Sequence, residues 1–120
     1  MQIDFGERRV TIDDVVAANG DRQPAFGEAL DMDVVFERML VDVGDQKVVF
    51  TTGKDGILWK LDRKTGKFLG HKEMVFQNVY DRIDPQTGLL TYRNDIVEQK
   101  VQEWIQSCPS TEGGHNWQAM

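Results

Sequence analysis

From residue 39 onward, short apolar runs alternate with polar turn residues. Residues 39–43, 47–52 and 57–61 are rich in β-branched and aromatic side chains, and residues 67–69 (KFL) begin a fourth expected strand. Turn-forming residues separate these runs: Gly44-Asp45, Lys54-Asp55-Gly56 and Asp62-Arg63-Lys64-Thr65-Gly66. Asp–Gly and Thr–Gly steps suit tight turns because glycine readily adopts positive φ. The pattern therefore predicts an all-β segment, an antiparallel four-stranded meander.

A meander of this size cannot bury both of its faces by itself. Four-stranded sheets of this kind are the repeating blades of β-propellers, in which neighbouring blades cover each other's faces. The pattern predicts one to two such blades with irregular loops. We expect the partial propeller segment to span residues 28–120 and leave residues 1–27 unassigned.

One turn sequence occurs twice. Residues 61–67 (LDRKTGK) are echoed by residues 83–89 (IDPQTGL). In each copy an apolar residue ends a strand, the aspartate can accept hydrogen bonds from the turn amides, and the glycine is placed for the left-handed conformation. Two copies favour a repeat, although aspartate followed by Thr–Gly also occurs in unrelated hairpins.

Helical patterns are short. Residues 11–20 are expected to form a short helix, with Thr11 as N-cap and Asn19-Gly20 as its stop, and residues 31–36 a helical turn. Residues 94–106 fit either an amphipathic helix starting near Asp95 or an irregular crossing. Residues 107–114 have the composition of a loop.

Charge and hydropathy exclude several classes of function. The chain carries 14 basic and 20 acidic residues, a net charge of −6. This balance argues against a nucleic-acid partner, which normally meets a basic face. No apolar run approaches the ~20 residues needed for a membrane span, and the first residues show no secretory signal.

Metal and nucleotide motifs are not supported by their spacings. His71, His115 and Cys108 do not make a zinc set, because the spacing is wrong and a fourth ligand is lacking. His71 is expected to be a solvated turn residue. Thr51-Thr52-Gly53-Lys54 lacks the leading glycine of a phosphate-binding loop and a Ser or Thr after the lysine.

Two longer segments resemble a known family. Residues 53–67 (GKDGILWKLDRKTGK) are similar to the basic-residue, Asn/Asp-Gly, strand, Leu-Asp-Arg stretch of quinoprotein alcohol dehydrogenases. Cys108-Pro109-Ser110, followed by residues 113–117 (GGHNW), resembles a second signature of that family in the same order. The Asp-x-x-Thr-Gly turns resemble its tryptophan docking motif, with Tyr92 in the tryptophan position of the second copy and Gly70 in that of the first.

The resemblance implies a fold, an activity and partners. The family is an eight-bladed propeller that oxidises small alcohols with pyrroloquinoline quinone (PQQ), beside Ca²⁺ or a lanthanide. An aspartate base takes the alcohol proton while hydride passes to the quinone, and electrons leave to a cytochrome in the periplasm. On this reading, the remainder of the propeller is a partner of this chain.

Three residues match family positions at the cofactor. Lys54 stands where a Lys or Arg reaches the quinone oxygens and stabilises developing negative charge. Asn116 and Trp117 stand where an Asn–Trp pair borders PQQ, so that the amide can bond it and the indole can pack near its plane. From the residues alone, an ordinary turn lysine is the favoured interpretation of Lys54, and only the flanking match reverses it. For Asn116-Trp117, a capped loop with a core tryptophan is an equal alternative. Cys108 matches a cysteine whose disulfide partner would lie beyond Met120.

Other family features have no counterpart. The aspartate base, the Glu and Asn metal ligands and the adjacent-cysteine disulfide are not recognisable, and Asp31, Asp33 and Asp42 stand in no matching frame. No catalytic residue is assigned, and we expect the chain alone to be catalytically incomplete. A propeller-repeat scaffold protein and an autonomous small β domain are the alternative interpretations.

Overall fold

The computed structural model describes residues 2–4, 9–11 and 37–117. Strands account for most of its regular structure: β1 (Gln2–Asp4), β2 (Arg9–Thr11), β3 (Arg38–Val43), β4 (Gln46–Thr51), β5 (Ile57–Asp62), β6 (Phe68–Glu73), β7 (Tyr80–Ile83) and β8 (Leu90–Tyr92). One short helix, α2 (Asn94–Val97), follows β8. Of the helix expected at residues 11–20, only Thr11 is described, and it ends β2. The rest of that helix, the helical turn expected at residues 31–36 and the boundary after residue 27 lie outside the described residues.

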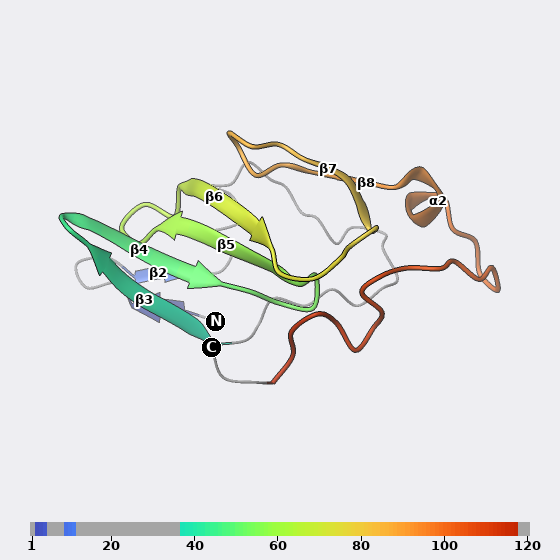
Figure 1. Ribbon diagram of the computed structural model, residues 1–120, viewed down its shortest axis with the longest axis horizontal. Coiled ribbons are helices and arrows are strands. Elements are labelled where there is room, and N and C mark those ends of the chain that lie inside the picture. The colour runs from blue at the N-terminus through green and yellow to red at the C-terminus, as the bar shows by residue number, and fades with distance from the viewer. Residues whose placement is uncertain (1, 5–8, 12–36, 118–120) are drawn as a thin grey trace.

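The central sheet is an antiparallel meander in the order β3-β4-β5-β6 (Figure 1). Its register runs across all four strands, as the row Arg38, Thr51, Trp59 and His71 shows. A bulge between Lys60 and Leu61 shifts the pairing with β6. The four-stranded meander predicted from residues 39–69 is confirmed, with β3 to β5 beginning and ending within one residue of the expected runs. The short β1–β2 hairpin was not predicted.

One face of the meander is buried. Val49, Leu61 and Phe68 lie in successive strands on this face and are almost fully shielded from solvent. The antiparallel β7–β8 hairpin and α2 cover them, contributing Val79, Tyr80 and Ile96 to the core. The hairpin and α2 therefore shield the apolar face of the meander, which a single four-stranded sheet cannot bury by itself.

Both copies of the recurring turn have the same hydrogen bonds. Asp62 Oδ1 accepts from the amides of Lys64 and Thr65 at 2.9 and 2.8 Å, and Asp84 Oδ1 accepts at 2.9 Å from the equivalent amides of residues 86 and 87. Gly66 and Gly88 have φ of 75° and 74°. A Cβ on Gly88 would lie 2.7 Å from the Phe68 ring, so the second turn packs against the meander.

The segment after β8 is mostly irregular. The helix that begins at Asn94 ends at Val97, and residues 98–106 continue as turns and coil. Ile96 is buried, whereas Trp104 is fully exposed and Val101 nearly so. Of the two interpretations of residues 94–106, the irregular crossing holds for all but the first turn.

His71 does not lie in a solvated turn, and that prediction is wrong. It lies within β6, half-buried, with its ring 5.7 Å from the Trp59 ring and 6.1 Å from the Phe68 ring. Alternation along β6 turns this side chain toward its cross-strand neighbour Trp59. The imidazole is therefore part of an aromatic cluster on the sheet.

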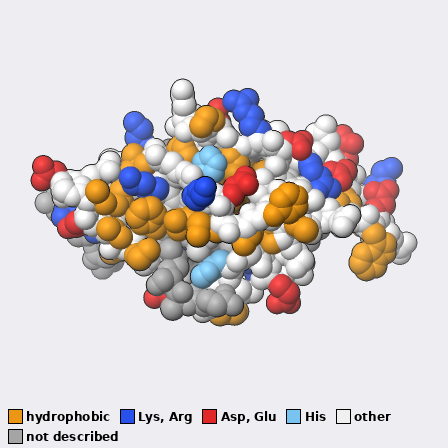
Figure 2. All heavy atoms as spheres, viewed as in Figure 1, with side chains coloured by type: hydrophobic (Ala, Val, Ile, Leu, Met, Phe, Trp, Pro, Cys, Tyr) orange, Lys and Arg blue, Asp and Glu red, His pale blue; other side chains and the backbone are white. Residues whose placement is uncertain are grey.

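The β3 edge of the meander exposes apolar side chains. Met39, Leu40 and Val43 of β3 are 41%, 48% and 53% exposed. Figure 2 shows apolar side chains gathered over the β3–β4 side of the molecule. Among the described residues no helix is long and apolar enough to cross a membrane.

Candidate functional site

Three segments that are distant in the sequence meet at one end of the meander. They are the β4–β5 turn around Lys54, the residues that follow β6, and the loop near the C-terminus. The Gly114 amide donates to the Lys54 carbonyl oxygen at 2.9 Å, and the Met74 amide donates to the Gly56 carbonyl oxygen at 2.9 Å. Backbone hydrogen bonds thus hold all three segments together.

Glycine makes this contact possible. Gly113 has φ of 82°, and a Cβ there would lie 2.6 Å from Lys54 Cα. A Cβ on Gly114 would lie 2.8 Å from Gly56 Cα and 2.7 Å from Val75 Cγ2. Real side chains do not tolerate such distances, so the close approach of the two loops depends on residues without side chains.

Asp55 closes the β4–β5 turn from inside. Its carboxylate is 4% exposed and accepts hydrogen bonds from the Ile57 amide at 3.0 Å and from Trp59 Nε1 at 3.1 Å. Burial raises the pKa of the Asp55 carboxyl to about 6, although these hydrogen bonds act in the opposite direction. The Gly56 amide donates to the Gly53 carbonyl oxygen at 2.9 Å and completes the turn.

The predicted cofactor-binding residues lie on the segments that meet. Lys54 is half-buried at the tip of the turn, in direct contact with Gly113. Asn116 and Trp117 follow that glycine pair; Asn116 Nδ2 donates to the Glu112 carbonyl oxygen at 3.1 Å. This hydrogen bond caps the loop, as expected if Asn116 has a structural role. The Trp117 side chain, in contrast, is 84% exposed and is no core tryptophan.

Cys108 anchors the start of the C-terminal loop. Its amide donates to Asn78 Oδ1 at 2.7 Å, and its carbonyl oxygen accepts from the Asn78 amide at 2.8 Å. The thiol is half-buried and forms no disulfide. These two hydrogen bonds of the Cys108 backbone attach the loop to the segment between β6 and β7. The backbone of Cys108 therefore has a structural role.

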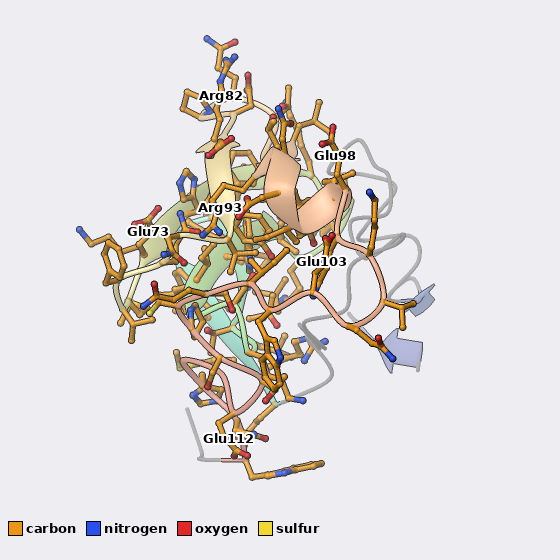
Figure 3. The ribbon with its side chains drawn as sticks, turned by 90° about the vertical axis from the view of Figure 1, so that its right-hand side faces the viewer. Glu73, Arg82, Arg93, Glu98, Glu103 and Glu112 are labelled. Atoms are coloured by element: carbon orange, nitrogen blue, oxygen red, sulfur yellow. The ribbon has the colours of Figure 1, made fainter. Side chains whose placement is uncertain are left out.

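Arg93 reinforces the same attachment. Its guanidinium donates to the Asn78 carbonyl oxygen at 2.6 Å and to the Gln106 carbonyl oxygen at 3.2 Å, and it pairs with Asp95 at 2.6 Å. In Figure 3 Arg93 lies beside α2, between the hairpin that carries Arg82 and the loop that carries Glu112. The ion pair with Asp95 raises the pKa of Arg93 and lowers that of Asp95.

Several of these residues were not identified from the sequence. Asp55 was assigned only to an Asp–Gly turn, yet a tryptophan four residues later can reach back to its carboxylate. Asn78, Arg93 and Val75 carry no local signal, because their partners lie about 15 to 40 residues away in the chain. Only the tertiary contacts assign them to the site.

Polar groups lie on both sides of the contact between the two loops. Beside the Lys54 turn, the hydroxyls of Thr51 and Thr52 are buried and form no hydrogen bond within the described part of the chain. Within the same part of the chain no group of three or more His, Cys, Asp or Glu could hold a metal ion.

Sequence comparisons relate this segment to quinone-dependent dehydrogenases. The chain is 32% identical over 90 residues to lupanine 17-hydroxylase (cytochrome c) from Pseudomonas sp, covering 74% of this chain and 13% of that protein. It is 36% identical over 73 residues to the dehydrogenase subunit of alcohol dehydrogenase (quinone) from Acetobacter aceti, covering 61% of this chain and 10% of that protein. No family model matches the chain.

The backbone leads to the same relatives. A solved quinohemoprotein alcohol dehydrogenase from Pseudomonas putida HK5 superimposes with a TM-score of 0.60 at 26% identity, covering 68% of this chain and 13% of that one. The chain thus spans about a tenth of the length of the relatives it matches. By sequence and by fold, this chain is a homologue of the quinoprotein alcohol dehydrogenases and corresponds to one segment of their β-propeller.

Proposed function

We propose that this chain is part of a PQQ-dependent alcohol dehydrogenase and contributes Lys54, Asn116 and Trp117 to its PQQ-binding site. The observation that carries the proposal is the hydrogen bond from Gly114 to Lys54, together with the glycine contact around it. It brings together the two segments whose sequences resemble the family. Neither segment alone would make a site.

Each residue has a defined role in this proposal. PQQ, when bound, supplies the quinone that accepts hydride from the alcohol. The Lys54 ammonium would lie near a ligand oxygen and stabilise negative charge there. Asn116 would hold a carbonyl or carboxylate of the ligand through its amide, and the exposed Trp117 indole would pack against the ring.

The proposal leaves the chemistry incomplete on this chain. Alcohol oxidation needs a base, a metal and the quinone held together, and none of the described residues forms a metal site. We therefore propose that the aspartate base and the Ca²⁺ or lanthanide ligands come from the remainder of the propeller. The electron-accepting cytochrome and the periplasmic location are part of the same proposal. The chain alone should show no alcohol-dependent dye reduction with PQQ and Ca²⁺ present.

Cofactor binding can be tested directly on the chain. In ¹H–¹⁵N spectra, millimolar PQQ should shift the Lys54 and Gly113 amides and the Trp117 indole. Lys54→Met should weaken this response about tenfold, because one charged hydrogen bond is lost, and Lys54→Arg should retain it. Lys64→Met is the matched control, since Lys64 is an exposed lysine in the next turn. Unchanged spectra at millimolar PQQ would contradict a PQQ site on this chain.

The flanking coding sequence tests the larger assignment. Blade repeats, a signal peptide, an adjacent-cysteine motif and an aspartate-bearing blade on either side would support the dehydrogenase. Unrelated genes bounded by stop signals would favour an autonomous small β domain instead. Further Asp-x-x-Thr-Gly repeats without the other dehydrogenase features would favour a propeller scaffold.

A further inference from the structure

Asp55 connects the Lys54 turn to the core of the sheet. The two oxygens of its buried carboxylate have separate donors: Oδ1 accepts from the Ile57 amide, and Oδ2 accepts from Trp59 Nε1. The first bond closes the turn upon itself. The second runs to a side chain two residues into the interior of β5. The conformation of the turn is therefore tied to the position of one indole.

That indole is firmly held. Trp59 is 8% exposed and packs with its ring edge-on to Phe68, at 6.2 Å between centroids, and at a tilt against His71. Aromatic rings packed in this way have little freedom to move. Trp59 thus gives Asp55 a hydrogen-bond donor at a fixed position. Because Lys54 is the residue before Asp55, fixing Asp55 also limits the positions open to Lys54.

We propose that Asp55 is a positioning residue, which sets the turn that presents Lys54 and receives Gly114 through its bonds to Ile57 and Trp59. The inference rests on the proposed role of Lys54 in binding the cofactor. An ionised carboxylate accepts both bonds, and charge-assisted hydrogen bonds are the stronger ones. Asn in its place has a single acceptor oxygen and cannot satisfy both donors.

Protonation should therefore weaken the two hydrogen bonds that set the turn. Because burial raises the pKa of the Asp55 carboxyl to about 6, its carboxylate form predominates at neutral pH and is lost under mildly acidic conditions. Other titratable groups face this region: Lys54 in the turn itself, Glu73 opposite Ile57, His71 against Trp59, and His115 next to Gly114. Because both histidines are titratable, each is given a control variant.

The first experiment follows the turn without any cofactor. In ¹H–¹⁵N spectra of the full chain between pH 4.5 and 8, the Trp59 indole N–H and the Ile57 and Lys54 amides should shift with a shared midpoint near 6. The midpoint should persist in His71→Gln and His115→Asn and disappear in Asp55→Asn. A midpoint that survives Asp55→Asn, or Lys54 signals that do not follow those of Trp59, would overturn the proposal.

A second variant separates positioning from general folding. Trp59→Phe keeps the carboxylate and removes one donor to its ionised form, so the midpoint of the Ile57 and Lys54 amides should move to higher pH. In Asp55→Asn the Gly56 and Gly114 amides should exchange about tenfold faster, because the loss of a hydrogen bond to a charged group favours local opening. An unmoved midpoint in Trp59→Phe would exclude coupling through the indole.

PQQ titration then tests the functional consequence. Asp55→Asn should weaken PQQ binding about tenfold at pH 7.5 and abolish its dependence on pH near 6. Binding that is unaffected by Asp55→Asn would overturn the link between the turn and the ligand. If the wild-type chain binds no PQQ at any pH while the spectra behave as expected, the proposed function fails and the structural role of Asp55 stands.

Discussion

The Gly114 amide donates a 2.9 Å hydrogen bond to the carbonyl oxygen of Lys54. This bond joins a turn of the central sheet to a loop near the C-terminus. The glycines on both sides allow the backbones to approach to a distance that any Cβ would prevent. Substitutions at this contact are the most direct test of whether it builds the site.

Gly113→Ala should destabilise the chain and separate the two loops. The new Cβ would lie 2.6 Å from Lys54 Cα at a φ of 82°, and the strain and overpacking together cost about 3 kcal/mol. Gly44→Ala is the matched control: its φ is 59° and no atom lies within 4 Å of the new Cβ, so we expect a loss of about 1 kcal/mol. Denaturant unfolding measures both. Equal losses in the free energy of unfolding of the two variants would show that Gly113 is not tightly packed against Lys54.

Asp55 should make the chain more stable as the pH falls from 6 to 4. Its pKa is raised in the folded state from 3.8 to about 6, so in this window the folded state binds the proton and the unfolded state does not. Stability therefore falls as pH rises through the window, by about 3 kcal/mol for a shift of two units. Between pH 4.5 and 7 the contribution of Asp55 to this difference is about 2 kcal/mol, and urea unfolding at the two pH values should show it in the wild type. A difference of the same size in Asp55→Asn would contradict the assignment.

The recurring turns should behave as equivalent structural units. Asp62→Ala removes bonds to the amides of Lys64 and Thr65 and to the Thr65 hydroxyl, and we expect a loss of about 1–2 kcal/mol in the free energy of unfolding. Asp84→Ala should lower stability as well. Asp81→Ala, at an exposed position in β7, is the control and should have little effect. Hydrogen bonds lower the pKa of Asp62 and Asp84, so their contribution should disappear as the pH falls below about 4.

Arg93 should hold the C-terminal loop in place through its shape as well as its charge. Arg93→Lys keeps the charge but cannot reproduce the forked contacts with Asn78, Gln106 and Asp95. We expect the Cys108 and Gly114 amides to exchange about tenfold faster in this variant, as local opening becomes easier. Arg82→Lys, on the exposed hairpin, is the control. Unchanged exchange in Arg93→Lys would mean that charge alone suffices.

The β3 edge should promote self-association. It exposes Met39, Leu40 and Val43 and has no strand partner beyond β4 within the central sheet, and open apolar edges are templates for further pairing. Sedimentation of the wild-type chain should show concentration-dependent association, which Leu40→Lys reduces. Glu98→Gln, on the exposed segment after α2, changes the net charge by the same +1 and is the control. A wild-type chain that stays monomeric at high concentration would contradict this prediction.

Local pattern accounts for the strands and turns. Alternating apolar residues between Gly and Asp turns predicted β3 to β6, and the two Asp-x-x-Thr-Gly turns have the hydrogen bonds expected of them. These features depend on neighbouring residues alone, through backbone sterics and hydrogen bonds within a few positions. The resemblance to quinoprotein dehydrogenases also rests on contiguous residues, and the relatives match about two thirds of the chain.

Tertiary structure decided where these residues meet. The sequence predicts a turn at His71, but the structure places this residue in β6. The length of β6 depends on its pairing with β5, which its own composition does not show. The helix after Asn94 ends after one turn: Ile96 is buried in the core, whereas Val97 and Val101 face solvent. The approach of Gly114 to Lys54 and the burial of Asp55 against Trp59 depend on packing between distant segments, which no local pattern encodes. Local sequence therefore specifies the strands and turns and carries the family resemblance. Packing between distant segments brings the Lys54 turn and the C-terminal loop together as a candidate site.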